Sequence, residues 1–252
     1  MTGGNGNGAR FAAMPLAGGG TPVREWSIPE TLPALDLTEC PGLIVAAPHP
    51  DDETLGLGAM AAQLAASGVD VQVVSVSDGG AAEPGAPASR RIRLESQRRD
   101  ELLRATDVLG VRAPVSLGLP DGQLADHEDE LTVLLAEILD AAATRVWCAA
   151  TWRGDGHPDH EAVGRAAAAA CARTGATLLE YPVWMWHWAA PGDPTVPWDR
   201  ARRIDLTDDA LTAKATAAEA FSSQISPPSD ADAVLTPAVL HRLLAVGEVV
   251  FV

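Results

Sequence analysis

The sequence predicts an α/β fold in which helices cover both faces of a mainly parallel sheet, giving three layers. Short apolar runs alternate with amphipathic stretches along much of the chain, which is typical of strands joined by crossover helices. The apolar runs are uniformly hydrophobic, as expected of strands buried on both faces. With 252 residues, 47% of them hydrophobic and 21% charged, the chain is long enough to bury a core of this kind.

The alternation starts at residue 43. "LIVAAP" is short and apolar throughout, which favours a first buried strand, and the helical stretch 54–68 after it stops at a glycine. "DVQVVSVSDGG", residues 70–80, is rich in β-branched residues and runs into a glycine turn, so it is the second expected strand. Residues 88–110 form a long charged stretch that predicts a helix ending at Gly110.

The same pattern continues to about residue 184. The further elements expected, in order, are a strand and turn at 113–122, a helix at 129–144, a strand at 145–152, a helix at 157–175, a strand at 177–184 and a helix at 209–223. The tail after residue 223 is loosely patterned. No repeat or clear boundary interrupts the chain, so we expect a flexible Gly-rich arm at residues 1–21 and one domain at 22–252.

Composition excludes several classes of partner. The net charge is −16, and the basic residues within 90–104 are interleaved with acids, which argues against nucleic acid. No apolar run of about 18 residues is present, and the start lacks the charged and apolar regions of a signal peptide, so neither a membrane span nor secretion is expected. Cys40, Cys148 and Cys171 form no Cys-x-x-Cys pair, which fits a reducing cytoplasm, with Cys148 and Cys171 buried.

Two clusters of ionisable residues follow expected strands. One comes after the first strand and the other after the strand at 145–152; because carboxyl ends of parallel strands share one edge of the sheet, we expect the clusters to meet there. Their members are His49, Asp51, Asp52 and Glu53 in the first cluster, and His157, Asp159 and His160 in the second.

These residue types suit a catalytic metal. His49 and Asp52, three apart, can face one point, and His160 would be a third ligand. Three protein ligands with one open position are typical of catalytic zinc (Zn²⁺), although Fe²⁺ or another divalent ion could bind such a set. A helix entrance would also explain "HPDDE", because acids favour a helix N-terminus. The second cluster favours the metal, because histidines gain nothing from that end of a helix.

"AAPHPDDETLGLGA" together with "HPDH" resembles the PIG-L/LmbE-like deacetylases, zinc enzymes that remove N-acetyl groups from glucosamine-containing substrates. The paired His/Asp motifs are highly specific. Weaker similarities, convincing mainly in their order, extend over most of the chain: "SDGG", "RRDELLRATDVLG", "LGLPDGQL" and "KATAAEAFSSQ". The resemblance implies a Rossmann-like three-layer α/β/α sandwich, which agrees with the pattern of elements.

The resemblance also implies roles for individual residues. By motif position, His49, Asp52 and His160 would bind the metal, and Asp51 would be the general base for a metal-activated water. His157, in its protonated form, would face the developing oxyanion, and either His157 or Asp51 would protonate the departing amine. Asp159 would orient a histidine through a hydrogen bond. The implied partner is a small-molecule N-acetylglucosamine-type sugar or its conjugate.

Other residues near the motifs have simpler interpretations. Arg98 and Glu101 are expected to form an (i, i+3) helix pair with a structural role, and Asp121 to form a turn, although a contact with a sugar hydroxyl is open to it. Glu53 is interpreted as an acid at a helix start. His127 and His241 are expected on the surface.

The stretch 181–198 holds four of the seven tryptophans. On a strand, Trp184, Trp186 and Trp188 would share one face, and His187 would point the other way, to solvent or a pocket rim. A core strand or an interface in a homo-oligomer is the favoured interpretation, and a wall that stacks on a sugar is the alternative.

Two other functional classes compete with a deacetylase. "GLGAMA" with Asp78, 22 residues after Gly56, imitates a dinucleotide fingerprint. Its glycines do not follow the strand directly, however, and the intervening carboxylates would repel a diphosphate. We therefore expect Gly56 and Gly58 to permit close helix–sheet packing. A catalytically silent carbohydrate-binding protein would leave Asp51 without a purpose.

Overall fold

The structure is a computed structural model that describes residues 6–17, 19–26, 31–83, 85–142, 145–226 and 233–252. In this part of the chain, seven strands form one sheet in the order β3-β2-β1-β4-β5-β7-β6. The strands are β1 (Leu43–Ala47), β2 (Val71–Ser77), β3 (Val115–Leu119), β4 (Trp147–Thr151), β5 (Thr177–Tyr181), β6 (Ala201–Arg203) and β7 (Val249–Phe251).

The first five strands run parallel, and β7 pairs antiparallel with both β5 and β6. The predicted α/β class with a mainly parallel sheet is therefore confirmed. The helices are α1 (Asn7–Ala12), α2 (Asp52–Ala66), α3 (Ala88–Val108), α4 (Glu128–Ala141), α5 (Pro158–Thr174), α6 (Met185–Trp188), α7 (Asp208–Ala218), α8 (Ser222–Ile225) and α9 (Pro237–Ala245), with 3-10 turns at Val23–Glu25, Leu37–Glu39 and Leu124–His127.

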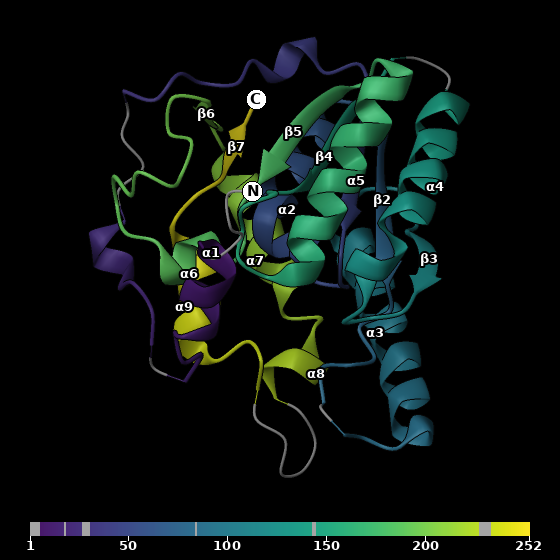
Figure 1. Cartoon of the computed structure of the whole chain (residues 1–252). Coiled ribbons are helices and arrows are strands. Elements are labelled where there is room, and N and C mark those ends of the chain that lie inside the picture. Colours follow the sequence, from purple (N-terminus) through teal and green to yellow (C-terminus); the bar gives the residue numbers. More distant parts are fainter. Residues whose placement is uncertain (1–5, 18, 27–30, 84, 143–144, 227–232) are drawn as a thin grey trace.

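Two hydrophobic cores lie on opposite faces of the sheet. Alternate residues of β1 separate into them: Leu43 and Val45 join the core under α2, α3, α7 and α9, whereas Ile44 and Ala46 join the core under α4 and α5. Figure 1 shows α4 and α5 together on one side of the sheet, with α2 and α7 behind it. The predicted burial of Cys148 and Cys171 is confirmed in the second of these cores.

Helix α2 is broken at Leu57, where φ is −138° and ψ is 18°. A break leaves amide groups without their carbonyl partners in the preceding turn, and a carboxylate can satisfy them as at a helix N-terminus. Glu248 does this: its carboxylate accepts hydrogen bonds from the amides of Ala59 (2.9 Å) and Met60 (2.8 Å). Lys214 balances its charge at 2.9 Å, and both side chains are buried.

Gly56 and Gly58 lie inside α2, not in a phosphate-binding turn. A Cβ atom on Gly56 would lie 2.3 Å from the Tyr181 ring of β5, so only glycine lets helix and sheet come this close. A Cβ on Gly58 would lie 3.3 Å from Lys214 Cγ of α7. The expectation of close packing against the sheet therefore applies to Gly56, whereas Gly58 faces α7.

The predicted strand through Trp184, Trp186 and Trp188 is wrong beyond Tyr181, because β5 ends there and the tryptophans lie in or next to the short helix α6. Pro182 cannot donate a hydrogen bond to a neighbouring strand. Strand β6, which lies before the predicted helix at 209–223, and β7 and α9 in the loosely patterned tail were not anticipated. Each of these two strands is only three residues long, too short for a period-2 pattern to show.

The segment 1–21, predicted to be a flexible arm, includes α1 in its described part. Residues 1–5 and 18 lie outside the described residues, and the division into an arm and one domain stays a prediction. None of the helices within the described ranges is long and apolar enough to cross a bilayer.

Candidate active site

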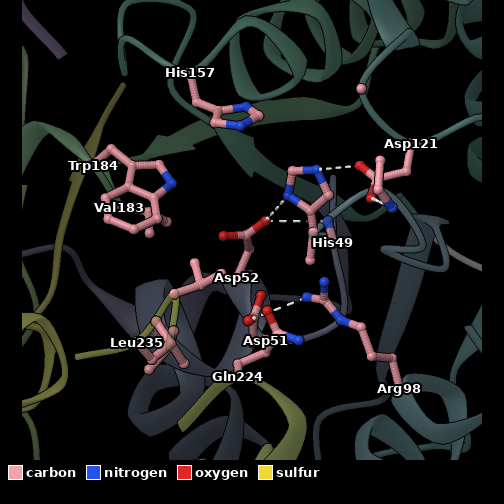
Figure 2. A pocket seen from close by; sticks show the side chains of 15 residues that line it. His49, Asp51, Asp52, Arg98, Asp121, His157, Val183, Trp184, Gln224 and Leu235 are labelled. Carbon is pink, nitrogen blue, oxygen red and sulfur yellow. Dashed lines mark hydrogen bonds and ion pairs between the residues drawn. The ribbon is translucent and has the colours of Figure 1, made fainter. Parts of the chain in front are cut away.

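The two ionisable clusters meet at the carboxyl edge of β1 and β4, beside a cavity of about 250 Å³. His49 and Asp51 come from the β1–α2 connection, Asp52 is the first residue of α2, and His157 directly precedes α5 (Figure 2). The lining residues are His49, Asp51, Asp52, Leu55, Ala81, Ala82, Arg98, Asp121, Gly122, His157, Val183, Trp184, Gln224, Val234 and Leu235.

His49, Asp52 and His160 present their ligand atoms to one point. Asp52 Oδ2 lies 3.0 Å from His49 Nδ1 and 3.2 Å from His160 Nε2. Tetrahedral zinc, with bonds of about 2.0–2.1 Å, holds neighbouring ligand atoms about 3.3 Å apart. His160 Nε2 is buried and has no hydrogen-bond partner, so it is a nitrogen that a cation would satisfy. The three residues fit a divalent metal ion. His49, His157 and Asp159 form a second such group among the described residues.

The imidazole rings of His49 and His160 each contact a carboxylate through the nitrogen that does not face Asp52. His160 Nδ1 lies 2.8 Å from Asp155 Oδ2, which turns Nε2 towards the cluster. His49 Nε2 lies 3.0 Å from Asp121 Oδ1 and 3.3 Å from Asp159 Oδ2, which leaves Nδ1 facing Asp52. Carboxylates placed in this way fix the tautomer and the orientation of histidines that bind metals.

Asp155 was missed by the sequence analysis. Its side chain is fully buried and accepts hydrogen bonds from the amides of Val183, Trp184 and Met185, at 2.9, 3.0 and 3.0 Å. These bonds turn the chain after β5 and so explain why the predicted strand stops. The only sequence signal was its place in "GDGHPDH", two residues before His157.

Asp121 and Asp159 connect the cluster to neighbouring loops. Asp121 lies in the turn expected of it, but its Oδ2 also accepts from the amide of Ala81 (2.7 Å) while Oδ1 faces His49. Asp159 accepts from the amides of Gly122 (2.8 Å) and Leu124 (3.1 Å). The loop after β3 is thereby fixed against the start of α5.

The electrostatics of the cluster favour an ionised Asp52. Burial alone would raise the pKa of Asp52, but His160 and His49 lower it well below its usual range. Burial alone would likewise lower the pKa of His160, yet Asp52 and Asp155 raise it to about 9. For His49, burial is outweighed by hydrogen bonds with Asp121, Asp159 and Asp52, which raise its pKa well above the ordinary value.

Asp51 is buried beside the cluster in a strained backbone conformation. Its φ of 141° is the one positive φ of a non-glycine residue in the described chain, and such a conformation costs about 1–3 kcal/mol. Burial raises the pKa of Asp51 to about 8, although the charge of Arg98 opposes this. Strain of this kind is typical of functional sites, and here it directs Asp51 into the cavity.

The predicted pair between Arg98 and Glu101 is absent: the two side chains are buried and have different partners. Arg98 lies 3.2 Å from Asp51 Oδ2 and donates to the carbonyls of Gly79 (3.1 Å) and Pro50 (2.9 Å). Glu101 turns instead towards α8, where it accepts from Ser222 and Ser223. The spacing was right for a pair, but buried partners on other elements outweigh a weak pair on one helix.

His157 is the N-cap residue of α5, where its Nδ1 accepts a hydrogen bond from the amide of Asp159 at 3.2 Å. Because an amide can only donate, the proton of the neutral ring is assigned to Nε2. Burial, together with the nearby His160 and His49, lowers the pKa of His157 to about 3. The ring therefore lines the cavity as a neutral donor and not in the protonated form expected from the sequence.

The other aromatic and histidine residues are distributed differently from the expectations. Trp184 lines the cavity, and Trp186 and Trp188 are buried in the core, so the preference for a core role is confirmed for these two. His187, expected at the surface or a rim, is 1% exposed and lies 2.9 Å from Arg242. The predicted position of His187 is wrong, because helix α6 turns its side chain towards α9.

The remaining acidic and histidine residues follow their predictions more closely. His241 is exposed, as expected. His127 is partly exposed and lies 3.0 Å from Glu130. Glu53 stands in the first turn of α2 as predicted, but it is buried and accepts from the amide of Asp51.

Comparisons with known proteins agree with this geometry. The profile of the PIG-L family, described as GlcNAc-PI de-N-acetylase, matches residues 44–171. A 1D-myo-inositol 2-acetamido-2-deoxy-alpha-D-glucopyranoside deacetylase from Mycobacterium sp. (strain KMS) is 28% identical over 82% of this chain and 84% of its own length. A diacetylchitobiose deacetylase from Thermococcus kodakarensis is 30% identical over 46% of this chain and 44% of its own.

Solved structures give the same result for the fold. A conserved protein from Thermus thermophilus superimposes with a TM-score of 0.56 at 29% identity, covering 72% of this chain and 79% of its own. A triple mutant of a deacetylase from the teicoplanin biosynthetic pathway gives a TM-score of 0.63 at 24% identity, covering 80% and 88%. The latter likeness shows the fold alone.

Proposed function

The chain belongs to the PIG-L family of GlcNAc-PI de-N-acetylases, and from this premise we propose that it is a metal-dependent hydrolase that removes the N-acetyl group from an N-acetylglucosamine-type sugar or a conjugate of one. The observation that carries the proposal is the convergence of His49, Asp52 and His160 on one point, with the buried, strained Asp51 beside them. A silent carbohydrate-binding protein would need neither the cluster nor the strain.

His49, Asp52 and His160 would hold the metal. Imidazole and carboxylate ligands suit zinc, and Fe²⁺ is the main alternative. When bound, such an ion lowers the pKa of water from about 15.7 towards 7 and polarises the amide carbonyl. Asp155 and Asp121 keep the two imidazoles in the required tautomers.

Asp51 would take the proton of the attacking water. Asp51 lines the cavity next to the ligand Asp52, and its hydrogen bond with Arg98 (3.2 Å) keeps the carboxylate in place. The proton that Asp51 accepts can then pass to the departing amine, so no further acid is required. Protonation of the amine releases the sugar and acetate.

His157 would donate a hydrogen bond from Nε2 to the oxygen of the tetrahedral intermediate. The donor proton is already on that nitrogen in the neutral ring, because Nδ1 accepts from the Asp159 amide. One donor of this kind is worth roughly 3–4 kcal/mol of the barrier. Asp159 acts through hydrogen bonds to the neighbouring loop and to His49.

The cavity suits a single sugar ring. Its volume of about 250 Å³ is below the range of roughly 300–1,000 Å³ usual for sites of drug-sized ligands, so the rest of a conjugate would lie outside. One side is polar, with His49, Asp121 and Arg98, and the other is apolar, with Trp184 and Leu235. Free thiols at all three cysteines agree with a cytoplasmic reaction.

The test is acetate release from N-acetylamino sugars, with and without chelator and added zinc. Asp51→Asn is expected to keep the metal but lose about 10²–10⁴-fold in kcat, because the amide cannot accept the proton. His160→Ala is expected to lose the metal. The exposed Asp126→Asn is the control for the change of charge.

Two outcomes would contradict the proposal. Unimpaired turnover in Asp51→Asn would remove the general base. Absence of acetate release by the zinc-loaded wild-type protein from every N-acetylamino sugar tested would refute the deacetylase function as a whole.

A further inference from the structure

We propose that the N-terminal helix α1 is a positioning element of this active site, which holds the His157 ring through Phe11 and the β4–α5 loop through Asn7. The inference rests on the proposed function. It extends that function to a segment outside residues 44–171, the part of the chain that matches the family profile.

Phe11 contacts the ring of His157 directly. The two ring centroids lie 5.9 Å apart at an angle of 58°, and the Phe11 ring also lies 5.1 Å from that of Trp184, which lines the cavity. A hydrogen bond from the Asp159 amide holds Nδ1 of His157. Phe11 adds a packing surface against the ring, and together the two contacts restrict the direction of Nε2.

The backbone of α1 packs against the loop that leads to His157. Asn7 Nδ2 donates to the carbonyl of Gly154 at 2.8 Å. Gly156 has a φ of +95°, and a Cβ atom there would lie 3.0 Å from Phe11 Cβ and 3.2 Å from the carbonyl oxygen of Asn7. This close approach means that α1 restricts residues 154–156, which contain Asp155 and directly precede His157.

Helix α1 owes its place to tertiary contacts. It has six residues, none of them buried, and a helix this short is not stable on its own in water. Arg10 fixes it through an ion pair with Asp193 and through stacking over the Trp188 ring at 4.4 Å. Figure 1 shows α1 beside α6 and α9, and the contact between α1 and α6 joins two segments far apart in sequence.

This arrangement predicts a particular kinetic signature. His157 would interact with an oxyanion that exists only after attack on the carbonyl, so a misplaced His157 raises the barrier without weakening substrate binding. Loss of Phe11 should therefore lower kcat more than it raises KM, which can change only through the contact with Trp184, and leave zinc stoichiometry unchanged. A packing defect with no link to His157 would instead lower the fraction of folded enzyme.

The experiment is a double-mutant cycle between Phe11 and His157 in the full-length, zinc-loaded protein. Phe11→Ala is expected to lower kcat roughly tenfold in the wild-type background, part of the 10²–10³-fold effect of removing an oxyanion donor, and to have no further effect in His157→Ala. Phe11→Leu should restore most of the rate. Trp26→Leu is the matched control, because this partly buried aromatic packs on Trp186 and should leave kcat unchanged.

Hydrogen exchange supplies a readout that does not depend on turnover. Amides across 153–157 should exchange faster in Phe11→Ala and Asn7→Ala, and at the wild-type rate in Trp26→Leu. An equal fall in kcat in both backgrounds, or unchanged exchange in these variants, would overturn the positioning role. If the wild-type protein releases no acetate, the proposed function fails, and exchange still decides whether α1 holds the loop.

Discussion

Asp155→Asn is the substitution that most directly tests how the metal cluster is supported. The Asp155 carboxylate is fully buried and accepts four hydrogen bonds: Oδ1 from the amides of Val183 and Met185, and Oδ2 from the amide of Trp184 and from His160 Nδ1. Asparagine has nearly the same shape, so the substitution changes the charge and the acceptors with little effect on packing volume.

The magnitude follows from these four bonds. An amide keeps one acceptor oxygen. If its NH2 group replaces Oδ1, the bonds from Val183 and Met185 are lost; if it replaces Oδ2, the Trp184 bond is lost and His160 can pair with it only in the other tautomer. Hydrogen bonds to a charged group contribute about 1.5–3 kcal/mol each, which gives a loss of roughly 1.5–6 kcal/mol in the free energy of unfolding. The total stability of a typical domain is about 5–15 kcal/mol. In either orientation a neutral amide supports the zinc-binding tautomer of His160 less well than a carboxylate, which should weaken zinc binding about 10–100-fold.

Urea unfolding without metal measures the loss in the free energy of unfolding, and competition with a chelating dye measures zinc affinity. Asp70→Asn is the matched control: its carboxylate is exposed and its ion pair with Arg112, at 3.3 Å, contributes at most about 1 kcal/mol. If Asp155→Asn stayed within about 1 kcal/mol of the wild type and bound zinc equally well, Asp155 would not be supporting His160, and the reasoning would fail.

Two further predictions concern packing and pH. Gly56→Ala should destabilise the protein by about 2 kcal/mol or more, because its Cβ would lie 2.3 Å from the Tyr181 ring, whereas Gly58→Ala should cost less, because its nearest contact, at 3.3 Å from Lys214 Cγ, needs a shift of only a few tenths of an ångström. Urea unfolding of both variants checks this, and similar losses would contradict it. Burial would raise the pKa of Glu180, but hydrogen bonds from Arg153 lower it below its ordinary 4.5. Its stabilisation should therefore be complete above about pH 4.5 and be lost as pH falls through the lowered pKa. In urea unfolding at a series of pH values, the difference in the free energy of unfolding between wild type and Glu180→Gln should decrease below about pH 4.5. A difference that stays constant with pH would contradict the lowered pKa of Glu180.

The alternation of strands and helices could be predicted from sequence because it depends on local patterns. Uniformly apolar runs such as Leu43–Ala47 are buried wherever the chain places them, and the predicted parallel sheet is confirmed. The convergence of His49 and His160 followed from the same rule, since His49 comes directly after β1 and His160 lies in the first turn of α5, the helix that follows β4. The structure places these rings 5.5 Å apart, centroid to centroid.

What could not be predicted depends on partners far away in sequence. The strand expected through Trp184 stops because the Asp155 carboxylate collects three amides, and nothing local to the tryptophans signals this. Arg98 and Glu101 have the spacing of a helix pair, yet each is buried against another element. Local spacing identifies candidate contacts, whereas burial decides which of them form.

The cap on α2 has a consequence for how the protein matures during translation. Residue 248 satisfies amides in a helix that leaves the ribosome nearly two hundred residues earlier, and it neutralises Lys214. In a nascent chain synthesised only as far as α7, Lys214 lacks its acidic partner and the break in α2 lacks its cap. The first turn of the same helix carries Asp52. The cap on the break in α2 can therefore form only after residue 248 has been synthesised, so the helix that begins with Asp52 lacks part of its stabilisation until then.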